Sequence, residues 1–190
     1  MHSVAGRYVA TALFALVLGA CGATRVSVTL APVGLVHVPA SVLPADTRAP
    51  RGSEALRIDF TSSPELLSEE GYILDDARFC DAEDSNQIRN QTLAPFLGDT
   101  SIRHPFTRGK LAAERANGAN ASARPVYSTY VSVARPAYPA MNQMPALPAY
   151  DLAREPRPLC VSLSLRDGYE LGRTTNTLTF SAEQVAAALR

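Results

Sequence analysis

The amino-acid sequence predicts a mostly β protein, either an antiparallel β-sandwich or a β-rich α+β domain, with a short C-terminal helix. Several segments alternate apolar and polar residues with the two-residue period of a half-buried strand, and turn-forming residues separate them. Only the C-terminal segment carries a complete helix signature. Of the 190 residues, 46% are hydrophobic and 19% are charged, which suffices for one packed domain and argues against wholesale disorder.

The first strands are expected soon after the N-terminal segment. Residues 25–31 alternate, with Val28 and Leu30 on the apolar face, so a half-buried strand is predicted there. Residues 34–38 form a second predicted strand, which ends before a proline. The following segment, residues 39–53, contains three prolines and a glycine and is expected to be a loop.

The next part of the chain carries two predicted strands on either side of a helix start. Residues 55–60 alternate cleanly, with apolar side chains at every second position. Ser63 and Pro64 are residue types preferred at the N-cap and first position of a helix, so a short helical turn is predicted to begin there. Residues 72–80 are expected to form a strand whose patterning is less regular toward its end.

The central region mixes one clear strand with segments that lack a pattern. Residues 81–125 are polar, and within them only a short helix at residues 110–115 is predicted. Residues 126–134 are dominated by β-branched and aromatic side chains, as is typical of strands. Residues 135–158 contain six prolines, which break regular pairing and favour extended or turn geometry.

The last predicted strands precede the C-terminal helix. Residues 159–165 alternate, with four apolar side chains on one face and Cys160 on the other. The Asp-Gly pair at residues 167–168 is typical of a hairpin turn, which leads to a short strand at residues 169–172. Another short strand is predicted at residues 177–180.

The C-terminal helix is the clearest local signal. Ser181 and Gln184 match a capping box, in which each side chain accepts a hydrogen bond from the other residue's backbone N–H. Phe180 and Val185 match the hydrophobic staple that accompanies such a box. A helix over residues 182–190 is therefore predicted. Because so short a helix is unstable alone in water, we expect it to pack against the strands.

The N-terminal segment has the organisation of an export signal. A single positive residue, Arg7, precedes an apolar run at residues 8–20, which is shorter than the roughly 20 apolar residues that a membrane-spanning helix needs. The run ends in Leu-Gly-Ala-Cys at residues 18–21, and this motif resembles the lipobox of bacterial lipoproteins. The resemblance implies cleavage of a signal peptide, residues 1–20, and acylation of Cys21. An ordinary secretory signal followed by a chance cysteine is the alternative.

Lipid on Cys21 would hold the protein on a membrane, because two or three acyl chains give a stable anchor. Residues 21–24 then form the lipidated N-terminus and a short tether, and residues 25–190 form a single β-rich domain close to the membrane. Gly22 follows the cysteine, and by analogy with lipoprotein sorting in enterobacteria this favours the outer membrane over the inner membrane. The domain is expected in the periplasm or at the cell surface.

Two further cysteines, Cys80 and Cys160, are expected to form a disulfide. An exported chain folds in an oxidising compartment, where an even pair of cysteines is usually bridged. Two unrelated buried thiols are the alternative. With Cys21 acylated, the bridge would leave no thiol for catalysis.

Charge and motifs argue against several classes of function. The 18 basic and 18 acidic side chains are dispersed along the chain and leave no basic surface for nucleic acid. The sequence contains no familiar catalytic or phosphate-binding motif, so we expect neither an enzyme nor a cofactor. His37 and His104 lie far apart in the sequence and show no metal-ligand spacing.

A group of acidic residues is the one sequence feature that suggests a cation. Its members are Asp75, Asp76, Asp81, Glu83 and Asp84. These residues lack the ligand spacing and central glycine of an EF-hand loop. They are therefore interpreted as a solvated acidic loop, and no metal site is predicted.

The proline-rich segment, residues 135–158, is the candidate binding site. Its apolar side chains lie on a backbone that prolines stiffen, and stiff segments lose little entropy when they dock. The candidate partner-binding residues are Tyr138, Met141, Met144, Leu147 and Tyr150. The alternative is a crossover loop whose apolar residues complete the core.

These features together predict a non-enzymatic envelope lipoprotein that acts by protein–protein contact, as a structural or accessory component of an envelope or surface assembly. Its expected partners are the membrane, through the N-terminal lipid, and an envelope protein. A ligand-binding lipoprotein, with a cavity between its sheets for a lipid, sugar or metal, is the alternative. An enzyme built from dispersed residues, for example His104 beside a carboxylate, is a third hypothesis.

Overall fold

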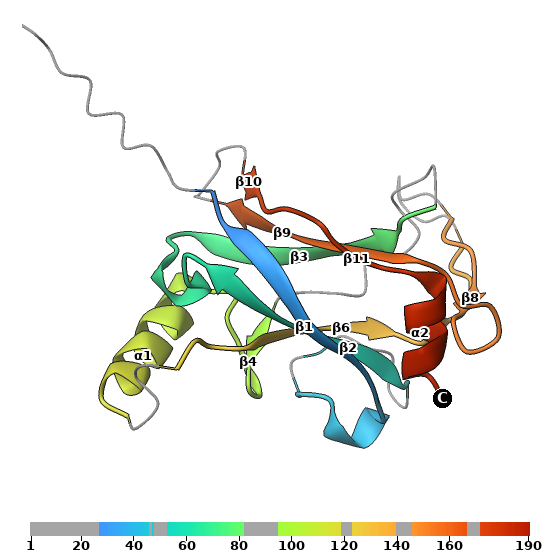
Figure 1. Cartoon of the computed structure of the whole chain (residues 1–190), viewed down its shortest axis with the longest axis horizontal. Coiled ribbons are helices and arrows are strands. Elements are labelled where there is room, and N and C mark those ends of the chain that lie inside the picture. Colours follow the sequence, from blue (N-terminus) through green and yellow to red (C-terminus); the bar gives the residue numbers. More distant parts are fainter. Residues whose placement is uncertain are drawn as a thin grey trace, which may run out of the picture.

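A computed structural model of the chain describes residues 27–45, 47, 53–81, 95–118, 123–139, 146–166 and 172–190. Within them, two antiparallel sheets face each other across a hydrophobic core, and a helix lies at each end (Figure 1). The predicted class, mostly β with a short C-terminal helix, is confirmed. A second helix of 12 residues makes the described part a β-rich α+β domain.

The first sheet has the strand order β1–β2–β6–β4–β5, with every neighbouring pair antiparallel. Within it, β2 lies between its two long partners, β1 and β6. The strands are β1 (Thr29–Val38), β2 (Ala55–Ser63), β4 (Phe96–Leu97), β5 (Thr100–Ser101) and β6 (Tyr127–Ser132).

The second sheet is built around β9, which pairs with β3 along its whole length and with β10 and β11 near its two ends. Its strands are β3 (Tyr72–Phe79), β9 (Leu159–Arg166), β10 (Arg173–Thr174) and β11 (Leu178–Phe180). The remaining elements are the hairpin strands β7 (Ala134–Arg135) and β8 (Tyr150–Asp151), the helices α1 (Pro105–Ala116) and α2 (Ala182–Ala188), and the 3-10 turns η1 (Ala40–Val42) and η2 (Leu66–Ser68).

β1 differs from its prediction, because the strands expected at residues 25–31 and 34–38 are one continuous strand. It pairs with β2 over its whole length, with a register shift between Pro32 and Gly34. The extra residue at this shift, Val33, is 58% exposed. A bulge of this kind keeps a strand continuous while it changes which residues face the core, so the two-residue alternation is interrupted there.

The prediction that a helical turn begins at Ser63 is wrong in position. Ser63 is the last residue of β2, where it pairs with Thr29, and the Ser63–Pro64 peptide bond is cis. The helical structure that follows is η2, a single 3-10 turn. The backbone N–H of Leu66, the first residue of this turn, donates to the hydroxyl of Ser62 at 3.2 Å, so a serine of β2 satisfies this donor.

Other predicted elements are confirmed with shifted ends. The helix predicted at residues 110–115 is α1, which begins earlier, at Pro105. The apolar face of β9 is buried as expected, with Cys160 on the opposite face. The turn predicted at residues 167–168 lies outside the described residues, as does most of the strand predicted at 169–172; β10 follows them and pairs with β9.

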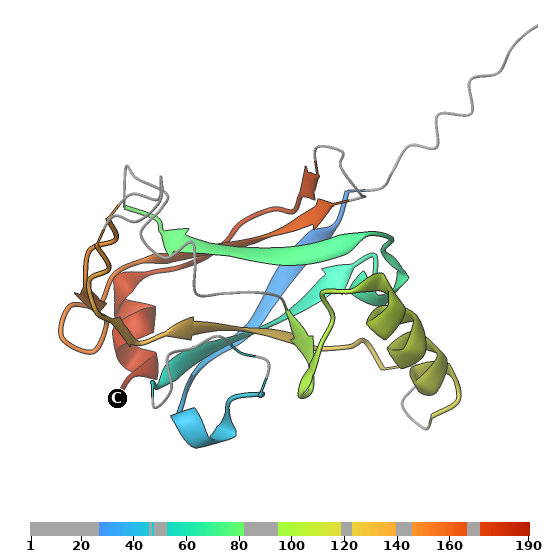
Figure 2. The same ribbon diagram turned by 180° about the vertical axis from the view of Figure 1, so that it is seen from behind.

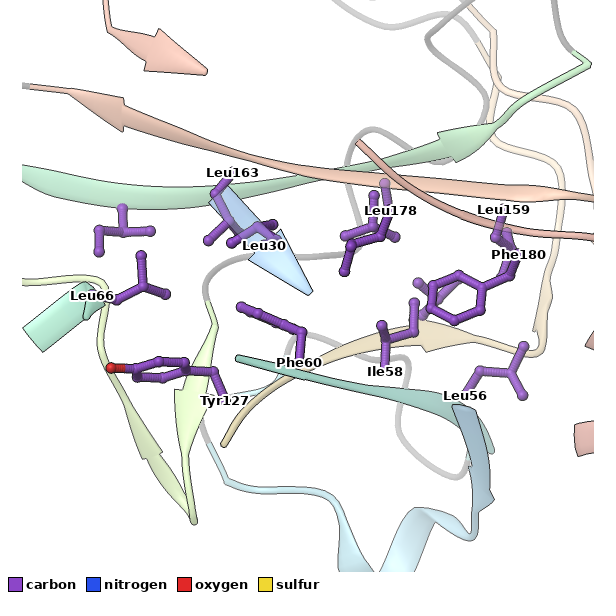
Figure 3. Close-up of a cluster of buried hydrophobic side chains, with 14 of the residues drawn as sticks. Leu30, Leu56, Ile58, Phe60, Leu66, Tyr127, Leu159, Leu163, Leu178 and Phe180 are labelled. Atoms are coloured by element: carbon purple, nitrogen blue, oxygen red, sulfur yellow. The ribbon is translucent and has the colours of Figure 1, made fainter. Parts of the chain in front are cut away.

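The core lies between the sheets, where side chains from both fill the interior (Figure 3). Phe60 and Tyr127 contribute from the first sheet, with their ring centres 5.9 Å apart. Leu159 and Leu163 contribute from the second sheet and are fully buried. Burial of each such side chain is worth about 1.5–3 kcal/mol, so this interior is the main source of the domain's stability.

The C-terminal helix forms with the predicted capping box. The Gln184 N–H donates to the Ser181 hydroxyl at 3.3 Å, and the Ser181 N–H donates to the Gln184 Oε1 at 2.8 Å. Phe180 and Val185, the predicted staple, are both buried in the core. α2 ends at Ala188 and packs against β1, which supplies the tertiary contact that a helix of this length needs.

The domain has two distinct ends. The N-terminal end carries the start of β1, which lies beside the end of β2, together with η2 and α1, which pack against each other. The hairpin end carries β7, β8 and α2. Figures 1 and 2 show this separation from opposite sides.

Candidate functional site

The proline-rich segment folds back on itself as the β7–β8 hairpin at the hairpin end of the domain. Arg135 pairs antiparallel with Tyr150 at the base of the hairpin. Further out, Tyr138 and Leu147 form a second bridge, in which both backbone hydrogen bonds are 2.9 Å long. The two arms of the segment therefore lie side by side rather than running singly across the domain.

Tyr150 fixes the hairpin to the rest of the domain. Its ring packs edge-on against Phe79 of β3, with 5.3 Å between the ring centres, and its hydroxyl donates to the Ser132 carbonyl at 3.1 Å. Burial raises the pKa of the Tyr150 hydroxyl, so this group keeps its proton and its role as a donor at alkaline as well as neutral pH. Tyr150 thus contributes to the packed interior.

Arg135, on the facing strand, is 2% exposed, but only some of its hydrogen-bond donors have a partner. Its Nη2 donates to the Pro148 carbonyl at 2.8 Å, and its guanidinium carbon lies 5.1 Å from the centre of the Tyr150 ring, a cation–π contact. In the described structure, Nε and Nη1 of Arg135 are buried without a hydrogen-bond partner. Burial lowers the pKa of Arg135, which reflects the cost of holding its charge away from water.

Arg108 of α1 is also buried, but all three of its guanidinium nitrogens have hydrogen-bond partners. Its side chain is fully buried and donates to the carbonyls of Glu69, Gly71, Ile102 and Arg103. Its Nη1 is 2.7 Å from the Ile102 oxygen and 3.0 Å from the Arg103 oxygen. Charge-assisted bonds of this type are strong, so Arg108 ties α1 to the turns that surround it.

The predicted disulfide is present at the hairpin end and joins β9 to the residue after β3. The Cα atoms of Cys80 and Cys160 are 5.1 Å apart. Next to the bridge, the Arg157 guanidinium lies 4.0 Å from the centre of the Phe79 ring and pairs with the Asp81 carboxylate at 2.8 Å. Because the same ring also contacts Tyr150, the base of the hairpin is packed against a cross-linked part of the second sheet.

The structure brings together three of the five residues predicted to contact a partner. Tyr138 and Leu147 face each other across the hairpin, and Tyr138 is 45% exposed. Tyr150 is held at the base by the contacts described above. Met141 and Met144 lie outside the described residues, as does the predicted lipidation site, Cys21.

Comparison with known proteins identified no relative of this chain. It matches no protein family, no curated protein and no solved structure. Among the helices that the structure describes, none combines the length and the apolar character needed to cross a membrane.

His37 and His104 do not share a site. His37 lies near the end of β1, with its Nε2 3.0 Å from a carboxylate oxygen of Glu54 in an exposed pair. His104 precedes α1 at the other end of the domain and packs edge-on against Tyr72, with 5.2 Å between the ring centres. The two histidines therefore lie in separate parts of the domain.

The acidic residues are likewise dispersed. Asp75 accepts a hydrogen bond from the Thr129 hydroxyl, and Asp81 forms the ion pair beside the disulfide. Glu83 and Asp84 lie outside the described residues. In the part of the chain that the structure describes, no group of three or more His, Cys, Asp or Glu side chains is placed to hold a metal ion.

Proposed function

We propose that this chain is a lipid-anchored protein of the bacterial cell envelope that binds a protein partner through its β7–β8 hairpin. Acyl chains on Cys21 hold it to a membrane, the outer rather than the inner, and the domain acts there as a structural or accessory component of an assembly. The observation that carries the binding role is the buried, incompletely bonded guanidinium of Arg135.

The proposed anchor fixes which end of the domain lies near the membrane. Ser27, the first described residue, lies six positions after Cys21. A fully extended chain of that length spans at most about 20 Å. Since β1 begins at Thr29, the N-terminal end of the domain stays beside the bilayer. The hairpin end then faces away from the anchor, where another envelope component can reach it.

The stability of the domain does not explain why residue 135 is an arginine. A buried N–H without a partner costs about 1–3 kcal/mol, and more on a charged group, and two nitrogens of Arg135, Nε and Nη1, are in this state. Its bond to Pro148 and its contact with Tyr150 offset only part of this cost. Buried polar groups are normally hydrogen-bonded. Exceptions are expected at functional sites, where the residue type serves binding rather than stability.

A partner can supply the missing hydrogen bonds, and the hairpin gives it a way to reach Arg135. A carbonyl or carboxylate of a partner can satisfy the free donors of Arg135, because both oxygen types accept charge-assisted hydrogen bonds. Between the described parts of the outer arms, the backbone hydrogen bonds are those of the Tyr138–Leu147 bridge, so a small local opening suffices for access. The half-exposed Tyr138 ring offers an apolar surface with a polar tip beside this opening.

The variant Arg135→Met tests this role by separating binding from stability. Methionine has a similar shape and no donors, so we expect the free energy of unfolding to change by less than about 1 kcal/mol or to increase. Binding should fall at least about tenfold, since charge-assisted hydrogen bonds are worth about 1.5–3 kcal/mol. Urea denaturation measures the first quantity. Photo-crosslinking from position 138, in cells with and without the substitution, measures the second.

The matched control is Val42→Ala, which truncates a side chain that is 56% exposed in η1 and should change neither measurement. A destabilisation above about 2 kcal/mol for Arg135→Met, together with an undiminished crosslink, would make Arg135 a structural residue and contradict the proposal.

A further inference from the structure

Large apolar side chains are exposed at the N-terminal end of the domain, away from the hairpin. Phe106, in the first turn of α1, is 86% exposed; Tyr72, at the start of β3, is 42% exposed; and Val126, just before β6, is 43% exposed. Single exposed apolar residues are ordinary on protein surfaces. Phe106 is unusual because almost its whole ring meets water, and it contributes nothing to the core that the fold requires.

Strand pairing places these side chains at the end from which the chain leads to Cys21. β1 begins at the Thr29–Ser63 pair, and η2, which follows β2, packs against α1. Tyr72 begins the next strand, and its ring contacts His104 immediately before α1. Figures 1 and 2 both show the start of β1 and α1 at the same end of the molecule.

We propose that this end of the domain rests on the bilayer surface, with the rings of Phe106 and Tyr72 in the interfacial layer of the lipid. The inference rests on the proposed acylation of Cys21. A tether of about 20 Å keeps this end within reach of the headgroups, and tethering makes the second contact intramolecular. Aromatic side chains favour the boundary between headgroups and acyl chains.

The proposed contact orients the domain rather than recruiting it. Two rings bury too little apolar area to hold a free protein on a membrane, whereas they can select one face of a protein that is already anchored. With the N-terminal end against the lipid, the hairpin end and Arg135 point away from the membrane.

The absence of tryptophan from the sequence allows a direct test, because one introduced tryptophan reports only its own surroundings. The full acylated chain with Phe106→Trp is reconstituted in phosphatidylethanolamine–phosphatidylglycerol vesicles with plain or brominated acyl chains. We expect bromine to quench the emission about twofold, since interfacial side chains reach about 5–10 Å into the headgroup–acyl boundary. The matched control is Val42→Trp, an exposed position beyond the far end of β1, whose emission should not change.

The outcomes separate the inference from the anchor. Equal emission of Phe106→Trp in plain and brominated vesicles, with the chain floating with the vesicles, would overturn the inference and leave the anchor intact. Equal quenching of both variants would also overturn it, because the domain would then have no preferred face. A chain that neither floats nor carries acyl mass would refute the proposed function, and the inference with it.

Discussion

Removal of the disulfide, by Cys80→Ala together with Cys160→Ala, is expected to lower the free energy of unfolding by about 4.5 kcal/mol. The bridge links residues separated by 80 positions, and its effect on the unfolded chain grows with the logarithm of that length. Domains are typically stable by about 5–15 kcal/mol, so the double variant should be close to the limit of folding.

Urea denaturation followed by circular dichroism measures this loss. Reduction of the natural disulfide should shift the midpoint equally, and the double variant should not respond to the reductant. β3 and β9 already pair along all of β3, so the bridge acts mainly on the unfolded chain rather than by adding strand contacts. A loss below about 1 kcal/mol would show that the unfolded chain is not constrained in this way.

Replacement of Arg108 by methionine is expected to cost about 3–5 kcal/mol, because the backbone carbonyls that it bonds lose their donor and each such loss costs about 1–3 kcal/mol. The substitution removes the Arg108 donors from four backbone carbonyls, at positions 69, 71, 102 and 103, and of these the Arg103 carbonyl keeps the Ile73 N–H at 3.1 Å. Each unmet carbonyl costs about 1–3 kcal/mol before local relaxation. α1 should also loosen from η2, which hydrogen exchange of the helix amides would detect.

Lys110→Met is the matched control for Arg108→Met, because it removes the same charge from the same helix at a side chain that is 70% exposed. Its effect on stability should stay within about 0.5 kcal/mol. Equal destabilisation by both substitutions would mean that the helix charge matters and the carbonyl bonds do not. The contrast with Arg135→Met is equally informative, because Arg108→Met is expected to destabilise the domain strongly and Arg135→Met is not.

Local sequence patterns predicted the elements that are determined by residues close together in the sequence. The Ser181–Gln184 capping box involves only neighbours along the chain, so its residue types were sufficient to predict it. Alternation over residues 55–60 and 159–165 predicted strands correctly, because both segments have one face on the core. The disulfide could be predicted from two cysteines in a chain that is expected to be exported, although the sequence could not show that β3 and β9 are neighbours.

Features that depend on distant residues could not be predicted. The bulge at Val33 follows from pairing with β2, and Ser63 does not begin a helix because it completes a strand pair with Thr29. The sequence likewise gives no sign that Arg108 is fully bonded while Arg135 is not. That difference arises from which carbonyls the fold brings to each guanidinium.

Mass spectrometry of the N-terminal peptide, isolated from envelopes of a bacterium that exports the protein, tests the account most directly. We expect a peptide that starts at residue 21, with a diacylglycerol on its sulfur and a further acyl chain on its amino group where the host adds one. A peptide that still contains residues 1–20, or that begins elsewhere and bears a free or disulfide-linked Cys21, would contradict the account.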